Sequence, residues 1–107
     1  MQISVEQLQA LRERGEAIYL VDVRQPWEHE TASLPGTDLL VPLDELADRL
    51  DEVQPAAGAL VVTYCHHGIR SLSAAAILAQ AGHARVASLA GGIDRWSQAI
   101  DPGVPRY

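Results

Sequence analysis

The chain's single cysteine lies in a segment whose residue types could carry nucleophilic chemistry. Cys65 is followed by two histidines, by Gly68 and, five positions on, by Arg70. A tight loop that contains glycine can turn several backbone N–H groups toward one point, and a helix that begins there adds the positive end of its dipole. Such a field favours a thiolate over a thiol. Because a guanidinium can hold the oxygens of a sulfonate-like group, the segment predicts a cysteine nucleophile beside an anion-binding loop.

The alternative interpretation of Cys65 is a buried core thiol, since free cysteine is among the most buried residue types. Its polar neighbours His66 and His67 argue against a core position. Imidazoles titrate near neutrality and could tune the thiolate, but we expect these two to be exposed residues that act through their backbone amides. His29 and His83 have no cysteine or histidine partner at metal-ligand spacing. We interpret both as surface residues and expect no metal site.

Apolar segments that alternate with amphipathic ones predict the elements that position this loop. Ser4 and Gln7 form a candidate capping box for a first helix, which Gly15 ends. We expect buried strands over 18–23, 39–41, 59–64 and 86–89, and further helices over 43–53, 71–81 and 93–100. This alternation predicts a parallel α/β sheet covered by helices on both faces. Cys65 would then follow the carboxyl end of a strand, where ligands bind in such folds.

Three charged residues lie at and just after the end of the first predicted long strand: Asp22, Arg24 and Glu28. Residues at such a place serve either catalysis or the fixing of loops. We expect structural support of the site, with Arg24 paired to Asp22 or Glu28. Trp27 and Trp96 are interpreted as packing residues.

Composition narrows the classes of function. The 107 residues, 48% of them hydrophobic, fit one compact domain over residues 1–107. The net charge is −6 and the 8 basic residues, all arginine, are scattered, which argues against a nucleic-acid binder and requires local capture of any anionic substrate. No apolar run approaches the roughly 20 residues of a membrane span, and the first residues do not resemble a signal peptide. We therefore expect a cytoplasmic protein that binds no membrane.

Four blocks of the sequence resemble signatures of the rhodanese family. The segment 65–71 is similar to the family's active-site loop, 19–28 to its D-V-R-x-P-x-E segment, 34–36 to its I-P-G-A turn and 89–96 to its closing L-x-G-G-x-x-x-W signature. The blocks come in order and cover nearly all of the chain. Ala32 and Ser33 replace the Gly-His that usually precedes the I-P-G turn, and Thr37 replaces its alanine. Local packing is expected to differ there.

The resemblance implies a rhodanese-like fold with a central parallel sheet of about five strands. It also implies a sulfurtransferase in which Cys65 attacks the outer sulfur of thiosulfate, expels sulfite and passes the sulfane sulfur to a thiophilic acceptor. The loop amides would hold the persulfide and the departing anion, and Arg70 matches a position linked to substrate choice. No metal or organic cofactor is required. The predicted substrate-binding residues are His66, His67, Gly68, Ile69, Arg70 and Ser71.

Two other functions stay open. Cysteine-dependent phosphatases also set a thiolate and an arginine around an anion loop, but their motif is C-x5-R, whereas the shorter C-x4-R loop here encloses a smaller volume. The second is a sulfur-relay module with weak activity on thiosulfate, which takes sulfur from a donor protein and gives it to a carrier protein. Residues 100–107 resemble the ending of rhodanese domains fused to adenylating enzymes that activate ubiquitin-like sulfur carriers.

Overall fold

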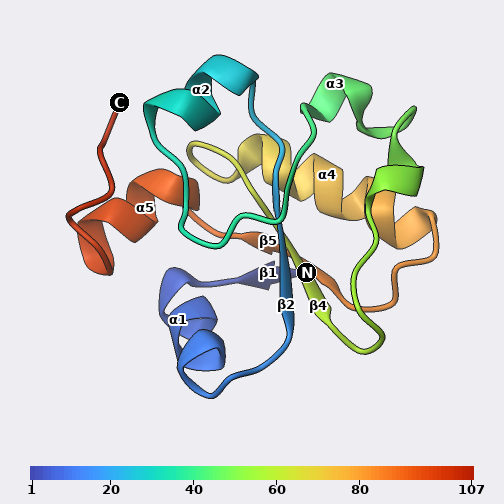
Figure 1. The fold of residues 1–107 in the computed structure, drawn as a ribbon, viewed down its shortest axis with the longest axis horizontal. Helices are drawn as coiled ribbons and strands as arrows, with labels where there is room; N and C mark the ends of the chain where they lie inside the picture. The colour runs from blue at the N-terminus through green and yellow to red at the C-terminus, as the bar shows by residue number, and fades with distance from the viewer.

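The computed structural model describes residues 1–107 and contains one five-stranded sheet (Figure 1). The strands are β1 (Gln2–Ile3), β2 (Ile18–Asp22), β3 (Leu39–Leu40), β4 (Leu60–Tyr64) and β5 (Val86–Leu89). They lie in the order β1-β5-β4-β2-β3, and every neighbouring pair is parallel. The helices are α1 (Val5–Glu13), α2 (Pro26–Thr31), α3 (Leu43–Leu46), α4 (Ile69–Gln80) and α5 (Gly92–Ala99). The predicted parallel α/β fold is confirmed.

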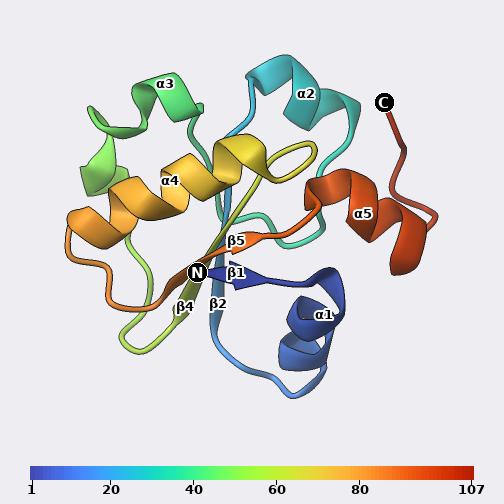
Figure 2. The same ribbon diagram turned by 180° about the vertical axis from the view of Figure 1, so that it is seen from behind.

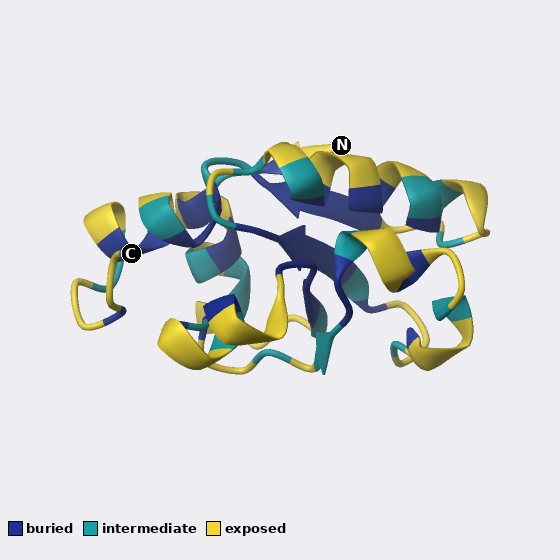
Figure 3. Cartoon of the chain, turned by 90° about the horizontal axis from the view of Figure 1, so that it is seen from above, coloured by how far each residue is buried: buried dark blue, intermediate teal, exposed yellow.

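Helices cover both faces of the sheet, and each face has its own core. On one face, Leu8 of α1 and Ile93 of α5 pack with Leu20 of β2. On the other, Leu78 of α4 packs with Val21, the next residue along β2. Alternate residues of one strand thus enter different cores, which explains why the strands read as unbroken apolar runs. Figure 3 shows the buried strands between helices whose outward sides are exposed.

Short signals set the helix starts. The backbone N–H of Gln7 donates to Ser4 Oγ at 3.0 Å and that of Ser4 to Gln7 Oε1 at 2.8 Å, so the predicted capping box begins α1. Pro26 occupies the first turn of α2, where its missing N–H costs no hydrogen bond. The helix α2 and the two-residue strand β1 are absent from the sequence prediction. Both are too short to produce a hydrophobic period.

One predicted helix is much shorter than expected. In place of a helix over 43–53, α3 has 4 residues, and a 3-10 turn follows at Leu50–Glu52. The backbone leaves helical geometry at Arg49 (φ −125°, ψ 27°), and Val53 then joins the core that contains Leu78. The remaining long elements differ from prediction by one or two residues at their ends, the range over which helix and strand limits are usually ambiguous. No helix combines the length and the apolar character needed to cross a membrane.

Candidate active site

The Cys65 loop connects β4 to α4 at the carboxyl edge of the sheet, beside α2 and the start of α5 (Figures 1 and 2). Gly68 is the N-cap of α4 and has a left-handed backbone (φ 101°), which favours glycine. A Cβ at this position would lie 3.0 Å from the backbone nitrogen of Gly91. The turn therefore needs glycine for both its conformation and its close packing.

The sulfur of Cys65 lies under the loop and is surrounded by donors. The residue is 1% exposed and packs in the core that contains Leu78 of α4, so the expectation of a position outside the core is wrong. The chain folds back over the side chain, and the backbone N–H groups of Gly68 and Ser71 donate to Sγ at 3.1 and 3.3 Å. The thiol in turn lies 3.5 Å from Ser71 Oγ.

The other backbone N–H groups of the loop are free. Those of His66, His67, Ile69 and Arg70 donate to no acceptor in the protein. Two of them belong to the first turn of α4, where N–H groups have no partner within the helix. The loop thus combines two donors on the sulfur with further unpaired donors next to it, the arrangement of an anion-binding loop.

Helix α5 begins against the backbone of the same loop. The N–H groups of Ile93 and Asp94 donate to the carbonyls of Cys65 and His66 at 2.9 and 3.1 Å. A Cβ on Gly92 would lie 2.5 Å from the His66 carbonyl oxygen and would also collide with that of Cys65. The Gly91-Gly92 pair, which the sequence indicates only as a turn, is thus a docking point that holds the loop in place.

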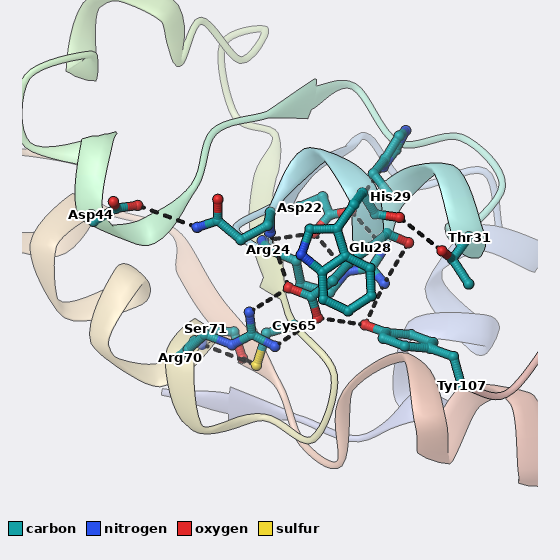
Figure 4. A network of polar contacts seen from close by, with 12 residues as sticks. Asp22, Arg24, Glu28, His29, Thr31, Asp44, Cys65, Arg70, Ser71 and Tyr107 are labelled. Atoms are coloured by element: carbon teal, nitrogen blue, oxygen red, sulfur yellow. Dashed lines mark hydrogen bonds and ion pairs between the residues drawn. The ribbon is translucent and has the colours of Figure 1, made fainter.

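The guanidinium of Arg70 is bound to Glu28 rather than free (Figure 4). Its Nη1 and Nη2 donate to Glu28 Oε1 and Oε2 at 2.7 and 3.0 Å. Glu28 also accepts from the Gln25 N–H at 3.1 Å and from the Tyr107 hydroxyl at 2.8 Å. The hydrogen bonds from Arg70 lower the pKa of Glu28 to about 2, although burial opposes the shift, and the same pair raises the pKa of Arg70. The Arg70 guanidinium, which is predicted to bind a substrate anion, binds the Glu28 carboxylate here.

Arg24 is fully buried and joins the segments around the site. Its Nε and Nη2 donate to the two carboxylate oxygens of Asp22 at 2.9 and 2.7 Å. Nη2 also reaches the Ala32 carbonyl at 2.7 Å, and Nη1 reaches the Tyr107 hydroxyl at 2.7 Å. Asp22 is thus the partner of Arg24, whereas the carboxylate of Glu28 holds Arg70. His29, expected at the surface, is partly buried with Nδ1 2.8 Å from Asp22 Oδ2.

Tyr107 is a site residue that the sequence prediction missed. Its ring stacks on His66 at a centroid distance of 4.0 Å, and His66 stacks on His67 at 4.0 Å. Burial is the largest cause that raises the pKa of Tyr107 to about 12 and the largest that lowers the pKa of His66. Trp27 lies edge-on to Tyr107 and is 61% exposed, so its predicted packing role is wrong, because α2 buries Glu28 instead. Trp96 is buried as expected.

Comparison with known proteins identifies the family of this chain. The profile of the Rhodanese-like domain matches residues 4–99. The chain belongs to the rhodanese-like family. Thiosulfate sulfurtransferase GlpE of Pseudomonas syringae is 42% identical over 96 residues, which are 88% of this chain and 84% of that protein. The rhodanese-like fold is also found in the human single-domain sulfurtransferase TSTD1, with a TM-score of 0.80, 25% identity, and coverage of 92% of this chain and 96% of that one.

Other relatives are larger proteins. The adenylyltransferase and sulfurtransferase uba4 of Ogataea parapolymorpha is 33% identical over 105 residues, which are 98% of this chain but 25% of that protein. The rhodanese-like chain therefore spans about a quarter of such a relative. Relatives of both kinds carry sulfurtransferase in their names.

Proposed function

We propose that the protein is a sulfurtransferase in which Cys65 carries a sulfane sulfur as a persulfide. With thiosulfate as donor, the Cys65 thiolate attacks the outer sulfur, a new S–S bond forms on Cys65, and sulfite leaves with the electron pair of the broken S–S bond. A thiophilic acceptor such as cyanide then attacks the outer sulfur and leaves as thiocyanate, which returns the thiolate. The covalent intermediate divides one transfer into two easier steps.

The surroundings of the Cys65 sulfur carry this proposal. Two backbone N–H groups already donate to Sγ, and four more in the same loop have no acceptor. An anionic persulfide extends one atom beyond Sγ and needs donors placed there in advance, because fixed dipoles stabilise charge without reorganisation. We infer that the four free amides among residues 66–70, all except that of Gly68, serve the outer sulfur and the leaving anion.

A protein sulfur donor or carrier is the second candidate for the partner of this reaction. Three of the four exposed large hydrophobic side chains lie on α2 and the first turn of α4, next to the loop: Trp27, Ile69 and Leu72. A small anion needs no apolar surface, whereas exposed apolar side chains around a site favour contact with another protein. This observation supports a relay role in addition to chemistry on small donors.

The test is the intact mass after incubation with thiosulfate under exclusion of oxygen. We expect a gain of one sulfur atom, which cyanide removes as thiocyanate. The Cys65→Ser variant keeps a similar shape but lacks the sulfur nucleophile, so it should gain no mass and form no thiocyanate while its circular dichroism is unchanged. Thiocyanate formation by this variant would refute the mechanism. An aryl phosphate assayed in parallel should not be hydrolysed.

A further inference from the structure

Arg70 and Glu28 form a pair whose charges cancel beside the nucleophile. The Arg70 side chain is 38% exposed, whereas the Glu28 side chain is only 5% exposed. The carboxylate is fixed from two further sides, by the Gln25 N–H and the Tyr107 hydroxyl, and it belongs to a helix anchored by Arg24 through the Glu28 carbonyl. Glu28 is therefore the fixed partner, and Arg70 is the one that could move.

The charges around the Cys65 loop leave little net attraction for a highly charged donor. Arg24, the other arginine of this network, is already paired with Asp22. Burial lowers the pKa of His66, which disfavours its charged form, and His67 Nδ1 lies 3.9 Å from Asp94 Oδ2. The dipoles of the loop amides are thus the main uncancelled attraction for an anion.

A donor that engages Arg70 must compete with Glu28 for the guanidinium. Two charge-assisted hydrogen bonds would have to break or be shared, and the donor would approach a carboxylate that stays ionised. Repulsion from one fixed charge doubles when the donor carries two negative charges instead of one. The penalty therefore falls more heavily on thiosulfate than on a monoanionic donor of the same shape.

We propose that Glu28 is a specificity-determining residue, which holds Arg70 and thereby makes the site discriminate against dianionic sulfur donors in favour of donors of lower charge. The inference rests on the proposed sulfurtransferase function. It predicts that the physiological donor carries at most one negative charge at the reacting group. A persulfide R–S–SH is such a donor: the Cys65 thiolate attacks its outer sulfur, and the S–S bond of the donor breaks. The inner sulfur leaves with the electron pair of that bond and takes up the proton as the thiol R–SH, with the persulfide anion left on Cys65.

Two small donors of matched shape test the proposal. Thiosulfate is a dianion, and methanethiosulfonate is a monoanion in which a methyl group replaces one oxygen; the first releases sulfite and the second methanesulfinate, and both leave the same persulfide on Cys65. The measured quantity is the ratio of kcat/KM for thiosulfate to that for methanethiosulfonate. In Glu28→Gln, which keeps the shape and removes the charge, this ratio should rise about tenfold, as removal of one nearby charge predicts.

Two further variants separate charge from structure. Glu28→Asp keeps the charge and should keep a low ratio, whatever its effect on absolute rates. Glu13→Gln makes the same change of net charge on α1, far from the loop, and should leave the ratio unchanged (Figures 1 and 2). A ratio that stays constant in Glu28→Gln would overturn the inference. A ratio that falls would also overturn it, because Glu28 would then be positioning Arg70 to bind thiosulfate. Failure of both donors to load sulfur on Cys65 would instead refute the proposed function itself.

Discussion

Cys65 Sγ is buried, and the donors that contact it are backbone N–H groups that already point toward it. Gly68 and Ser71 donate from the backbone, and no substitution other than proline removes those N–H groups. Side-chain substitutions therefore test the charged residues around the sulfur more directly than they test the amides.

Arg70→Ala removes the only arginine of the loop. We expect kcat/KM for thiosulfate to fall about ten- to a hundredfold, because loss of a charge-assisted pair worth about 1.5–3 kcal/mol leaves the Glu28 carboxylate uncompensated beside the approaching dianion. The matched control is Arg49→Ala, which removes an arginine paired with two glutamates on the surface away from the loop. Unchanged kinetics in Arg70→Ala would mean that the loop amides alone bind the anion.

Tyr107→Phe removes a hydroxyl that both accepts from Arg24 and donates to Glu28. We expect the free energy of unfolding to decrease by about 1–2 kcal/mol, since two charged groups each lose a partner. Urea denaturation measures it. Tyr19→Phe is the control, because the Tyr19 hydroxyl makes only exposed hydrogen bonds of 3.3 Å. An equal decrease in the free energy of unfolding of both variants would contradict the assigned role of Tyr107.

The start of α5 packs against the Cys65 loop, and this close contact requires that residue 92 has no side chain. Gly92→Ala adds a Cβ in collision with the loop carbonyls at a left-handed φ of 62°. Gly58→Ala is the matched control, with a φ of 81° and no atom within 4 Å of the added Cβ. The left-handed backbone should lower the free energy of unfolding by about 1–2 kcal/mol in both variants. In Gly92→Ala, overpacking should lower it by about 1–3 kcal/mol more. Equal Tm values in the two variants would refute the docking role.

The long elements could be predicted because their burial is repeated along the sequence. The runs that became β4 and β5 enter cores on both faces, and α4 alternates buried and exposed residues at helical spacing. The sequence overestimates the length of α3, because Leu50 and Val53, the apolar residues after it, pack from a turn and not from a continuous helix. A pattern reports which residues are buried and not how the backbone brings them there.

The polar contacts of the site could be predicted only in part. The sequence predicts that Arg24 pairs with either Asp22 or Glu28, and the structure gives Asp22, two positions away at the end of β2. Glu28 and Arg70 are 42 positions apart, and Tyr107 is 79 positions from Glu28. These contacts depend on the strand order and on the path of the segment after α5, neither of which has a signal in the chain itself.

For the whole molecule, the same ion pair links stability to pH. The pKa of Glu28 is about 2 in the folded protein and about 4.3 for an ordinary glutamate, so the unfolded chain binds a proton first as the pH falls. The contribution of Glu28 is present in full above about pH 5 and is lost as the pH falls toward 2. The free energy of unfolding should therefore decrease more steeply with acid in the wild-type protein than in Glu28→Gln. Parallel curves from urea titrations over this range would contradict the assignment.

The strand order has a consequence for synthesis on the ribosome. Strand β1 pairs only with β5 (Figure 1), and Gln2 lies opposite Ser88, 86 residues later. At translation rates of roughly 5–20 residues per second, the first strand waits on the order of 4–17 s before its partner has been made. During this time the apolar residues of α1 that pack against α5 also lack their partner. The nascent chain therefore exposes its first strand and helix until nearly the whole sheet has been translated, and this interval is when the protein is most open to chaperones and to aggregation.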